Sequence, residues 1–192
     1  MRNRATLPIV LLAMVAPVSA NAQERGWNGT LVPYVGSPVV DDIDALPDHS
    51  AIDLGVLVGV SYDLELPLPW LALRGTVNRS LGAKVFNGSD RADGAFGSVG
   101  IDVRLSPVPR DWLVRPFLAY GPAWFYASHA ARGSLDRLHP SWRTGSTAGI
   151  GADVGRDRWS LRVEATVRRY SPFAEFQDGH FLLSAGLLLP LH

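Results

Sequence analysis

Beyond its first two dozen residues, the chain alternates large apolar residues with polar or small ones at every second position. In Ile52–Tyr62 every second residue is apolar, and Asp, Gly and Ser occupy most positions between. The segment Phe181–Leu191 repeats this alternation. A period of two predicts β-strands with two different faces, because an amphipathic helix requires a period near 3.6. No convincing helical pattern follows residue 22.

The alternation predicts eight strands, whose first and last residues it defines to within a few positions. They are Trp27–Gly36, Ala51–Asp63, Trp70–Arg79, Ala95–Leu105, Trp112–Ala127, Trp142–Gly155, Trp159–Tyr170 and Gly179–Leu191. These strands are longer than the ~5–6 residues of an average strand and reach the ~9–11 residues of a tilted membrane strand. Long and short connections alternate between them, and prolines occupy two of the short ones. The pattern predicts an antiparallel up-and-down sheet with its long loops at one end.

The two faces of the predicted strands differ in kind. When each strand is oriented by its most apolar face, the charged residues fall on the other face: Asp53, Arg74, Asp102, Arg104, Arg115, Arg143, Asp153, Arg162, Glu164 and Arg168. One face is rich in Val, Leu and Ile, and the other mixes Gly and Ala with Arg, Asp and Glu. Such a mixture packs poorly as a core, but it suits a salt-bridged lumen. We therefore predict an all-β fold, an eight-stranded antiparallel up-and-down transmembrane β-barrel that is apolar outside and charged within. Closure is required because an open edge in lipid leaves backbone groups unpaired.

Tryptophan positions support the same orientation. Four tryptophans open odd-numbered strands and two flank the third long connection: Trp27, Trp70, Trp112 and Trp159 in the first group, Trp124 and Trp142 in the second. Two such groups predict an aromatic girdle at each membrane interface. The alternative is that these rings fill gaps in a core. Parity places Trp70 on the polar face unless its strand starts with an irregularity.

The N-terminus has the pattern of an export signal. Arg2 and Arg4 precede an apolar stretch over residues 5–18, and Ser19-Ala20-Asn21-Ala22 follows it. This arrangement predicts a cleaved secretory signal peptide over residues 1–22 and a barrel domain over residues 23–192. A membrane helix is disfavoured, because the apolar stretch is shorter than the ~20 residues that a span needs.

Composition narrows the class further. The chain holds 18 basic and 18 acidic residues, and this neutral balance argues against a nucleic-acid partner. It holds no Cys, which excludes disulfides, thiolate metal sites and a Cys nucleophile. An exported protein without Cys fits a bacterial periplasm or outer membrane better than a small secreted eukaryotic domain. The five His residues are scattered without ligand spacing, so we expect no metal and no cofactor.

Several strand motifs together carry a resemblance to a known family. They are Val32-Pro33-Tyr34-Val35-Gly36, Gly100–Leu105, Arg115–Gly121, Ala148–Val154 and Val167–Tyr170. With them, the whole mature chain resembles the small eight-stranded outer-membrane barrels of Gram-negative bacteria, the OmpA/OmpX type. The resemblance implies Sec-type export to the outer membrane, a monomer, periplasmic termini and short turns, and extracellular long loops. Its partners would be outer-membrane lipid, lipopolysaccharide and the assembly machinery. Such barrels usually end in an aromatic residue, whereas this chain ends in Leu191-His192.

The function that follows is a structural or surface-interaction role in the cell envelope. The long loops would contact an unidentified partner, and the Arg, Asp and Glu side chains would plug the lumen. Arg79 and Arg169 are lipid-facing by parity and lie at the extracellular ends of their strands. We hypothesise that they contact lipopolysaccharide phosphates, because Arg binds phosphate with two hydrogen bonds. The alternative is ordinary rim arginines that point to water.

An enzymatic function resembling that of lipid A deacylases is a second hypothesis. The chain lacks the His-x-Ser-Asn pattern of those enzymes, and Ser128-His129 has the wrong order. His180 and Ser184 share the lumen face with Glu164, but four residues of strand place His and Ser ~13 Å apart. That distance is too long for a nucleophile and its base. We therefore expect that the chain is not an enzyme.

Two further alternatives concern the interior. Six Arg against four acids in the predicted lumen would favour anions in a narrow pore, although eight strands enclose only enough space for side chains. A soluble barrel of the lipocalin kind would also have eight strands and a signal peptide. Its interior would be apolar, however, and Gly26-Trp27 lacks the spacer of the Gly-x-Trp motif expected there.

Overall fold

The computed structural model describes residues 28–40, 50–87, 90–109, 112–129, 141–156, 159–170 and 179–191. The predicted signal peptide over residues 1–22 and Trp27 lie outside these ranges. Ten strands are present in the described parts: β1 (Gly29–Val40), β2 (Ser50–Asp53), β3 (Val56–Glu65), β4 (Leu71–Leu81), β5 (Lys84–Asn87), β6 (Asp90–Leu105), β7 (Val114–His129), β8 (Ser141–Arg156), β9 (Trp159–Tyr170) and β10 (Gly179–Leu191). No helix among the described residues is long and apolar enough to span a membrane.

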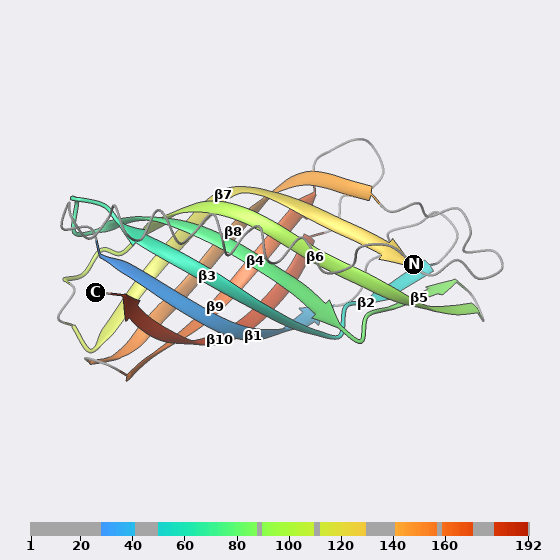
Figure 1. Cartoon of the computed structure of the whole chain (residues 1–192), viewed down its shortest axis with the longest axis horizontal. Coiled ribbons are helices and arrows are strands. Elements are labelled where there is room, and N and C mark those ends of the chain that lie inside the picture. The colour runs from blue at the N-terminus through green and yellow to red at the C-terminus, as the bar shows by residue number, and fades with distance from the viewer. Residues whose placement is uncertain are drawn as a thin grey trace.

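Eight of these strands close into an antiparallel barrel, as the sequence predicts. Around the barrel they follow the order β1, β3, β4, β6, β7, β8, β9 and β10, and β10 pairs with β1. Figure 1 shows them wrapped obliquely around the long axis of the molecule. Each pair is antiparallel, and β9 and β10 have the predicted bounds. We call the end with the short connections and with Asn28 and Leu191 the turn end, and the opposite one the loop end.

One predicted strand is broken in the structure. The segment predicted as Ala51–Asp63 forms β2 and β3, and β5 arises in what the sequence assigned to a connection. β2 pairs with β5 and β5 with β6, which extends the sheet beyond the barrel at the loop end (Figure 1). Gly55 and Gly82 mark the break, with φ angles of 61° and 76°. An alternation of apolar and small residues does not reveal a left-handed backbone, which explains why the sequence did not predict this break.

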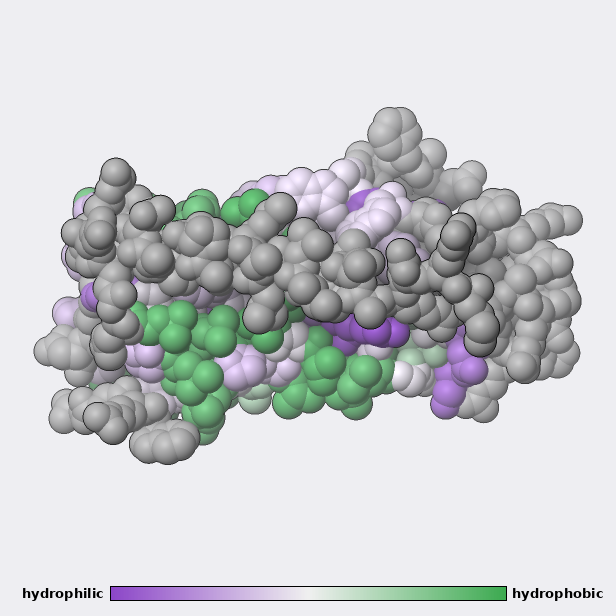
Figure 2. Space-filling view, in the orientation of Figure 1, coloured by the Kyte–Doolittle hydropathy of each residue, from purple (hydrophilic) through white to green (hydrophobic). Residues whose placement is uncertain are grey.

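Burial alternates along the strands with apolar residues outside. The outward-facing Leu118, Ile150 and Leu161 are 55–60 % exposed, whereas inward-facing Arg74 and Asp102 are at most 3 % exposed. Figure 2 shows apolar side chains over much of the described outer surface in that view. A water-soluble protein almost never buries charged residues fully while leaving its large apolar residues exposed in this way. The distribution is therefore inverted, as the sequence predicts.

Small residues on the inner face leave space for the large polar ones. A Cβ atom added to Gly149 would lie 2.5 Å from Oε1 of Glu164. A Cβ atom at Gly151 would lie 2.5 Å from both Cζ of Phe117 and the backbone oxygen of Val163. Real Cβ atoms do not approach other atoms so closely, so glycine at these positions is what allows the lumen to be filled by long side chains.

Candidate functional site

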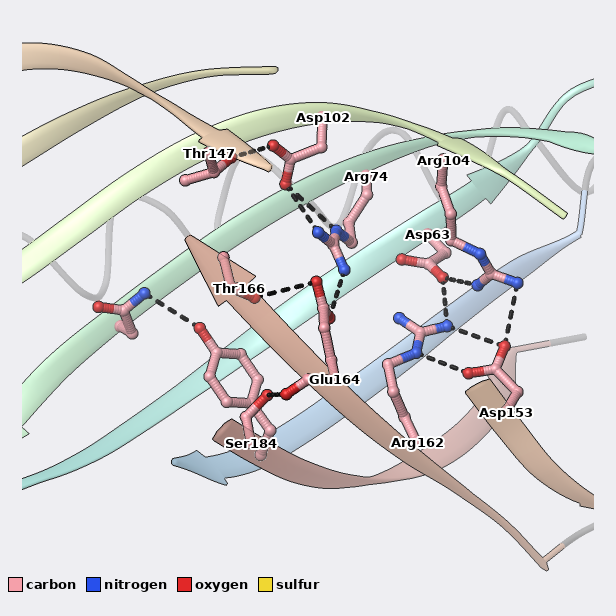
Figure 3. A network of polar contacts seen from close by, with 12 residues as sticks. Asp63, Arg74, Asp102, Arg104, Thr147, Asp153, Arg162, Glu164, Thr166 and Ser184 are labelled. Carbon is pink, nitrogen blue, oxygen red and sulfur yellow. Dashed lines mark hydrogen bonds and ion pairs between the residues drawn. The ribbon is translucent and has the colours of Figure 1, made fainter. Parts of the chain in front are cut away.

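The turn-end half of the lumen holds a closed ring of four charged side chains, which we call the lower ring: Asp63, Arg104, Asp153 and Arg162. Arg104 pairs with Asp63 and, at 3.0 Å, with Asp153. Arg162 pairs with the same two carboxylates at 2.7 Å each. The four residues come from β3, β6, β8 and β9, so the ring joins strands across the barrel (Figure 3). Two positive and two negative charges make it neutral, and all four residues are buried.

Phe117 of β7 packs against both arginines of the lower ring. The guanidinium carbons of Arg104 and Arg162 lie 4.8 and 5.0 Å from its ring centroid. The ring is 1 % exposed, so these cation–π contacts are formed away from water, where they are strongest. An apolar side chain in the charged interior thus holds two cations that would otherwise repel each other.

A second group of contacts lies on the loop side of the lower ring, and we call it the upper cluster: Arg74, Asp102, Thr147, Glu164 and Thr166. Arg74 donates to Oδ2 of Asp102 at 3.1 and 3.2 Å and to Oε2 of Glu164 at 2.7 Å. The hydroxyl of Thr147 donates to the other oxygen of Asp102, and that of Thr166 donates to Oε1 of Glu164 at 3.2 Å. Both carboxylates are therefore satisfied on both oxygens, as buried charges require.

A third group lies nearer the loop end and is mostly neutral. Nδ2 of Asn78 donates to the hydroxyl of Tyr34 at 3.0 Å, and the hydroxyl of Ser98 donates to Oδ1 of Asn78 at 3.1 Å. Arg168 reaches the same Oδ1 at 3.5 Å and lies over the ring of Phe125, 6.0 Å from its centroid. This group differs from the others because its cation, Arg168, contacts no carboxylate of the described residues.

Some of the lumen charges predicted from the sequence belong to the lower ring or the upper cluster, and the others lie outside both. The structure brings six together: Arg74, Asp102, Arg104, Asp153, Arg162 and Glu164. Arg115 and Arg168 face the lumen but are half-buried. Arg143 pairs in register with the buried Phe125 but is exposed, because it lies close to the start of β8 at the loop end. The side chain of Asp53 lies outside the described residues.

Sequence reasoning missed Asp63, a central member of the lower ring. It has the same parity as the buried Ser61, so the signal was present, but it stood at the last position of its predicted strand. The structure extends this strand to Glu65 and places Asp63 opposite Arg74 in register. The hydroxyl and amide partners of the charges were also missed, because period-two patterns do not separate a lumen threonine from any other small polar residue.

The tryptophans are placed at both ends of the barrel. Trp70 is 47 % and Trp112 is 55 % exposed at the turn end, whereas Trp124 and Trp142 are 38 % and 51 % exposed toward the loop end. Trp70 precedes β4 in a turn, which is the local irregularity that its parity required. Trp159 starts β9, but its side chain and Trp27 lie outside the described residues.

Arg79 and Arg169 are exposed and face outward. Arg79 lies near the end of β4 and pairs in register with Val58, and Arg169 lies near the end of β9. β4 and β9 are four strands apart in the barrel order, so the two arginines lie on opposite sides of the barrel. They are therefore separate positions rather than one site.

Comparisons with known proteins find the fold but no close relative. The sequence matches no protein-family model and no curated protein. Among solved structures, the N-terminal β-barrel domain of OprF from Pseudomonas aeruginosa matches with a TM-score of 0.61 and 9 % identity over 85 % of this chain and 97 % of that chain. The outer-membrane protein OprG from Pseudomonas aeruginosa matches with a TM-score of 0.58 and 8 % identity over 86 % of this chain and 96 % of that chain. The chain therefore shares the fold of the small eight-stranded outer-membrane β-barrels.

Proposed function

We propose that this protein is an integral outer-membrane β-barrel with a structural or surface-interaction role carried by its extracellular loops. The observation that supports this proposal most strongly is the inverted barrel, in which charges are buried and Val, Leu and Ile side chains are exposed. Exposing so much apolar surface to water is strongly unfavourable, whereas exposing it to lipid is not. Closure of the sheet also satisfies the backbone groups that lipid cannot hydrogen-bond.

The spacing of the tryptophans supports a membrane of ordinary thickness. Trp112 lies two residues before the start of β7, and Trp124 lies twelve positions further along, in the loop-side half of that strand. At about 3.4 Å per residue and a tilt of about 40°, they are about 30 Å apart along the barrel axis. This height matches the hydrocarbon core of a bilayer, which is about 30 Å thick. The two tryptophans would then lie at the two interfaces.

We further propose that the turn end is periplasmic and the loop end extracellular, after export through the Sec route. The partner of the loops is unidentified. β10 extends to Leu191 and pairs there with Gly29 of β1, so ordinary strand pairing forms the barrel seam.

Cell fractionation with a heat-modifiability gel tests the membrane assignment. The protein is expected in the detergent-soluble outer-membrane fraction, with faster gel mobility before boiling than after it. Recovery in the aqueous periplasmic fraction would instead support the soluble, lipocalin-like alternative. The charged interior argues against that alternative, because an apolar ligand would have to replace the ionic contacts of Arg74 and Arg162.

Lipopolysaccharide contact through Arg79 and Arg169 belongs to this proposal. Both side chains face outward near the loop ends of their strands, where phosphate groups would lie. Because they lie on opposite sides, each would bind a separate molecule, and their contributions would be independent.

We therefore predict that Arg79→Gln and Arg169→Gln each reduce the lipopolysaccharide that co-purifies with the barrel, and that the double variant shows the product of both effects. Quantitative mass spectrometry of the bound lipid measures this ratio, with Lys84→Gln as a control for loss of one positive charge. Unchanged lipid in the double variant would assign both residues to the solvated rim.

We propose that the chain is not a lipid-modifying enzyme. The hydroxyl of Ser184 donates to the backbone oxygen of Glu164 at 3.4 Å, and the Glu164 carboxylate is bound by Arg74 and Thr166. A carboxylate held in this way is not oriented toward a histidine base. The side chains of Ser128, His129 and His180 lie outside the described residues. Mass spectrometry of lipid A after overexpression is expected to show an unchanged acylation pattern, and a pattern that changes with the native chain but not with Ser184→Ala or His129→Ala would support the enzyme.

A further inference from the structure

A cavity of about 50 Å³ lies beside the upper cluster, and its lining extends from Arg162 of the lower ring to Arg168 nearer the loop end. At about 10–15 Å³ for each water-sized occupant, it has room for about three to five small molecules or ions. The polar part of its lining includes Tyr34, Thr76, Arg168 and, from the upper cluster, Asp102 and Glu164. Apolar side chains such as Val32, Leu57 and Leu182 complete the lining, and the volume is sufficient for a small ion with a few water molecules.

Arg168 is the unusual cation at this cavity. Arg74, Arg104 and Arg162 each contact two carboxylates, whereas Arg168 contacts the amide oxygen of Asn78, at 3.5 Å, and no carboxylate of the described residues. Its Nε atom is buried without a hydrogen-bond partner among the described residues, as are Nε of Arg104 and Nη1 of Arg162. What distinguishes Arg168 is therefore that no carboxylate of the described residues neutralises its charge, and an uncompensated charge in a buried position is costly.

The two carboxylates that line the cavity are already bound by other side chains. Asp102 is bound by Arg74 and Thr147, and Glu164 by Arg74 and Thr166. The hydroxyl of Tyr34 accepts a hydrogen bond from Asn78, which leaves its own O–H group to donate. Asn78 therefore joins two groups, Tyr34 and Arg168, that both have donor capacity to spare beside the same cavity.

The charges around the cavity favour an anion as its ligand. The charged side chains that line the cavity in the described part of the chain are three arginines and two carboxylates: Arg74, Arg162, Arg168, Asp102 and Glu164. The excess of one positive charge, in a narrow channel with low-dielectric walls, attracts anions from solution. On the turn side, the upper cluster and the neutral lower ring close the path.

We propose that Arg168 binds a small inorganic anion of halide or nitrate size in this cavity, with the Tyr34 hydroxyl as a second donor. The loop-side lumen is then a blind, anion-binding vestibule rather than part of a conducting path. The site requires only the folded barrel, so it goes beyond the proposed function and does not depend on a loop partner.

The test measures the urea unfolding midpoint of the purified, detergent-solubilised protein in sodium bromide and in sodium gluconate at equal ionic strength. Gluconate is too large for the cavity, so bromide is expected to raise the midpoint in a saturable way. Arg168→Gln is expected to abolish this difference, and Arg168→Lys to retain part of it. Tyr34→Phe is expected to weaken the apparent bromide affinity about tenfold, because it removes one hydrogen bond to a charged group.

Lys84→Gln is the matched control, because it removes one positive charge from β5, outside the barrel lumen. It is expected to keep the full bromide effect. An equal bromide effect in wild type and Arg168→Gln, or no effect in wild type, would overturn the proposal and leave the cavity to water. If Arg168→Gln does not fold, anomalous scattering from bromide in wild-type crystals decides: a peak beside Arg168 supports the site, and its absence overturns it.

Discussion

At the scale of single residues, the lumen depends on a few side chains that each contact several partners. Asp63 accepts from both arginines of the lower ring, and Phe117 packs beneath the same two guanidinium groups. Removal of one member of a buried ion pair leaves the remaining charges uncompensated in a low-dielectric interior. The stability of the barrel should therefore be far more sensitive to these residues than to its exposed charges.

Asp63→Asn is predicted to destabilise the barrel by about 3–5 kcal/mol, because Arg104 and Arg162 would lose the carboxylate that they share. Urea unfolding in detergent, followed by the gel shift between folded and unfolded bands, measures the change. Arg79→Gln removes an exposed charge and is expected to stay within about 0.5 kcal/mol of wild type. A loss of less than about 1 kcal/mol for Asp63→Asn would contradict the central role of the ring.

Gly151→Ala is predicted to cost about 1–3 kcal/mol, because the new Cβ atom would lie 2.5 Å from Phe117 and from the backbone oxygen of Val163. The same unfolding assay measures this effect. Gly75→Ala is the matched control in β4, where nothing lies within 4 Å of the added Cβ atom, and we expect it to be neutral or slightly stabilising. Equal effects of the two substitutions would show that the inner glycines are not required for packing.

At the scale of elements, the paired glycines between β2–β3 and β4–β5 separate the barrel from the extended sheet at the loop end. Gly55 and Gly82 lie between the register pairs Val56–Leu81 and Asp53–Lys84, so both strands change conformation at the same level. The sheet continues past this level as β2, β5 and β6. The barrel wall and its extension are therefore continuous in hydrogen bonding but distinct in backbone conformation.

Gly82 allows the effect of backbone conformation to be tested separately from packing. No atom lies within 4 Å of an added Cβ, so only its φ of 76° restricts which residues fit. Gly82→Asn is expected to be tolerated, whereas Gly82→Val should loosen β2 and β5, since a β-branched residue rarely adopts a positive φ. Hydrogen exchange would show faster exchange at residues 50–53 and 84–87 in the Val variant, with unchanged barrel amides. Identical exchange in both variants would mean that the extension does not depend on this conformation.

At the scale of the whole molecule, the lumen holds a buried network of ion pairs, and we infer that this network closes it to ions. The lower ring joins four strands across the barrel, and the upper cluster lies directly on its loop side (Figure 3). Asp63 adds a buried acid that the sequence-based charge count left out, so the interior is closer to neutral than six Arg and four acids suggested. Both features disfavour a steady ion current.

We predict that the purified protein forms no regular conductance steps in planar lipid bilayers, because ions would have to displace the lower ring. Arg104→Ala, which opens two of its four contacts, is expected to produce intermittent current. Arg79→Gln on the outer face serves as the control and should remain silent. Regular steps from the native chain would contradict the plug and favour the narrow pore.

Much of this architecture was predictable from the sequence, because the alternation of residues within one strand identifies its apolar and its polar face. The alternation along Ile52–Tyr62 and Phe181–Leu191 predicts both the strands and the face that bears the charges, and six of the predicted lumen charges lie in the ionic groups. The bounds of β9 and β10 followed from the same pattern. The breaks at Gly55 and Gly82 did not, since glycine fits both a regular strand and a left-handed turn.

The sequence by itself therefore determined the strands, their inner and outer faces, and the inverted distribution of apolar and charged residues. The tertiary structure decided which charges meet: Arg162 binds Asp63, 99 positions away, and Arg74 binds Glu164, 90 positions away. It also placed Arg168 beside a cavity and away from the carboxylates of the described residues. The physical reason is that parity is a property of one strand, whereas a contact across the lumen depends on the register of every strand pair around the closed barrel.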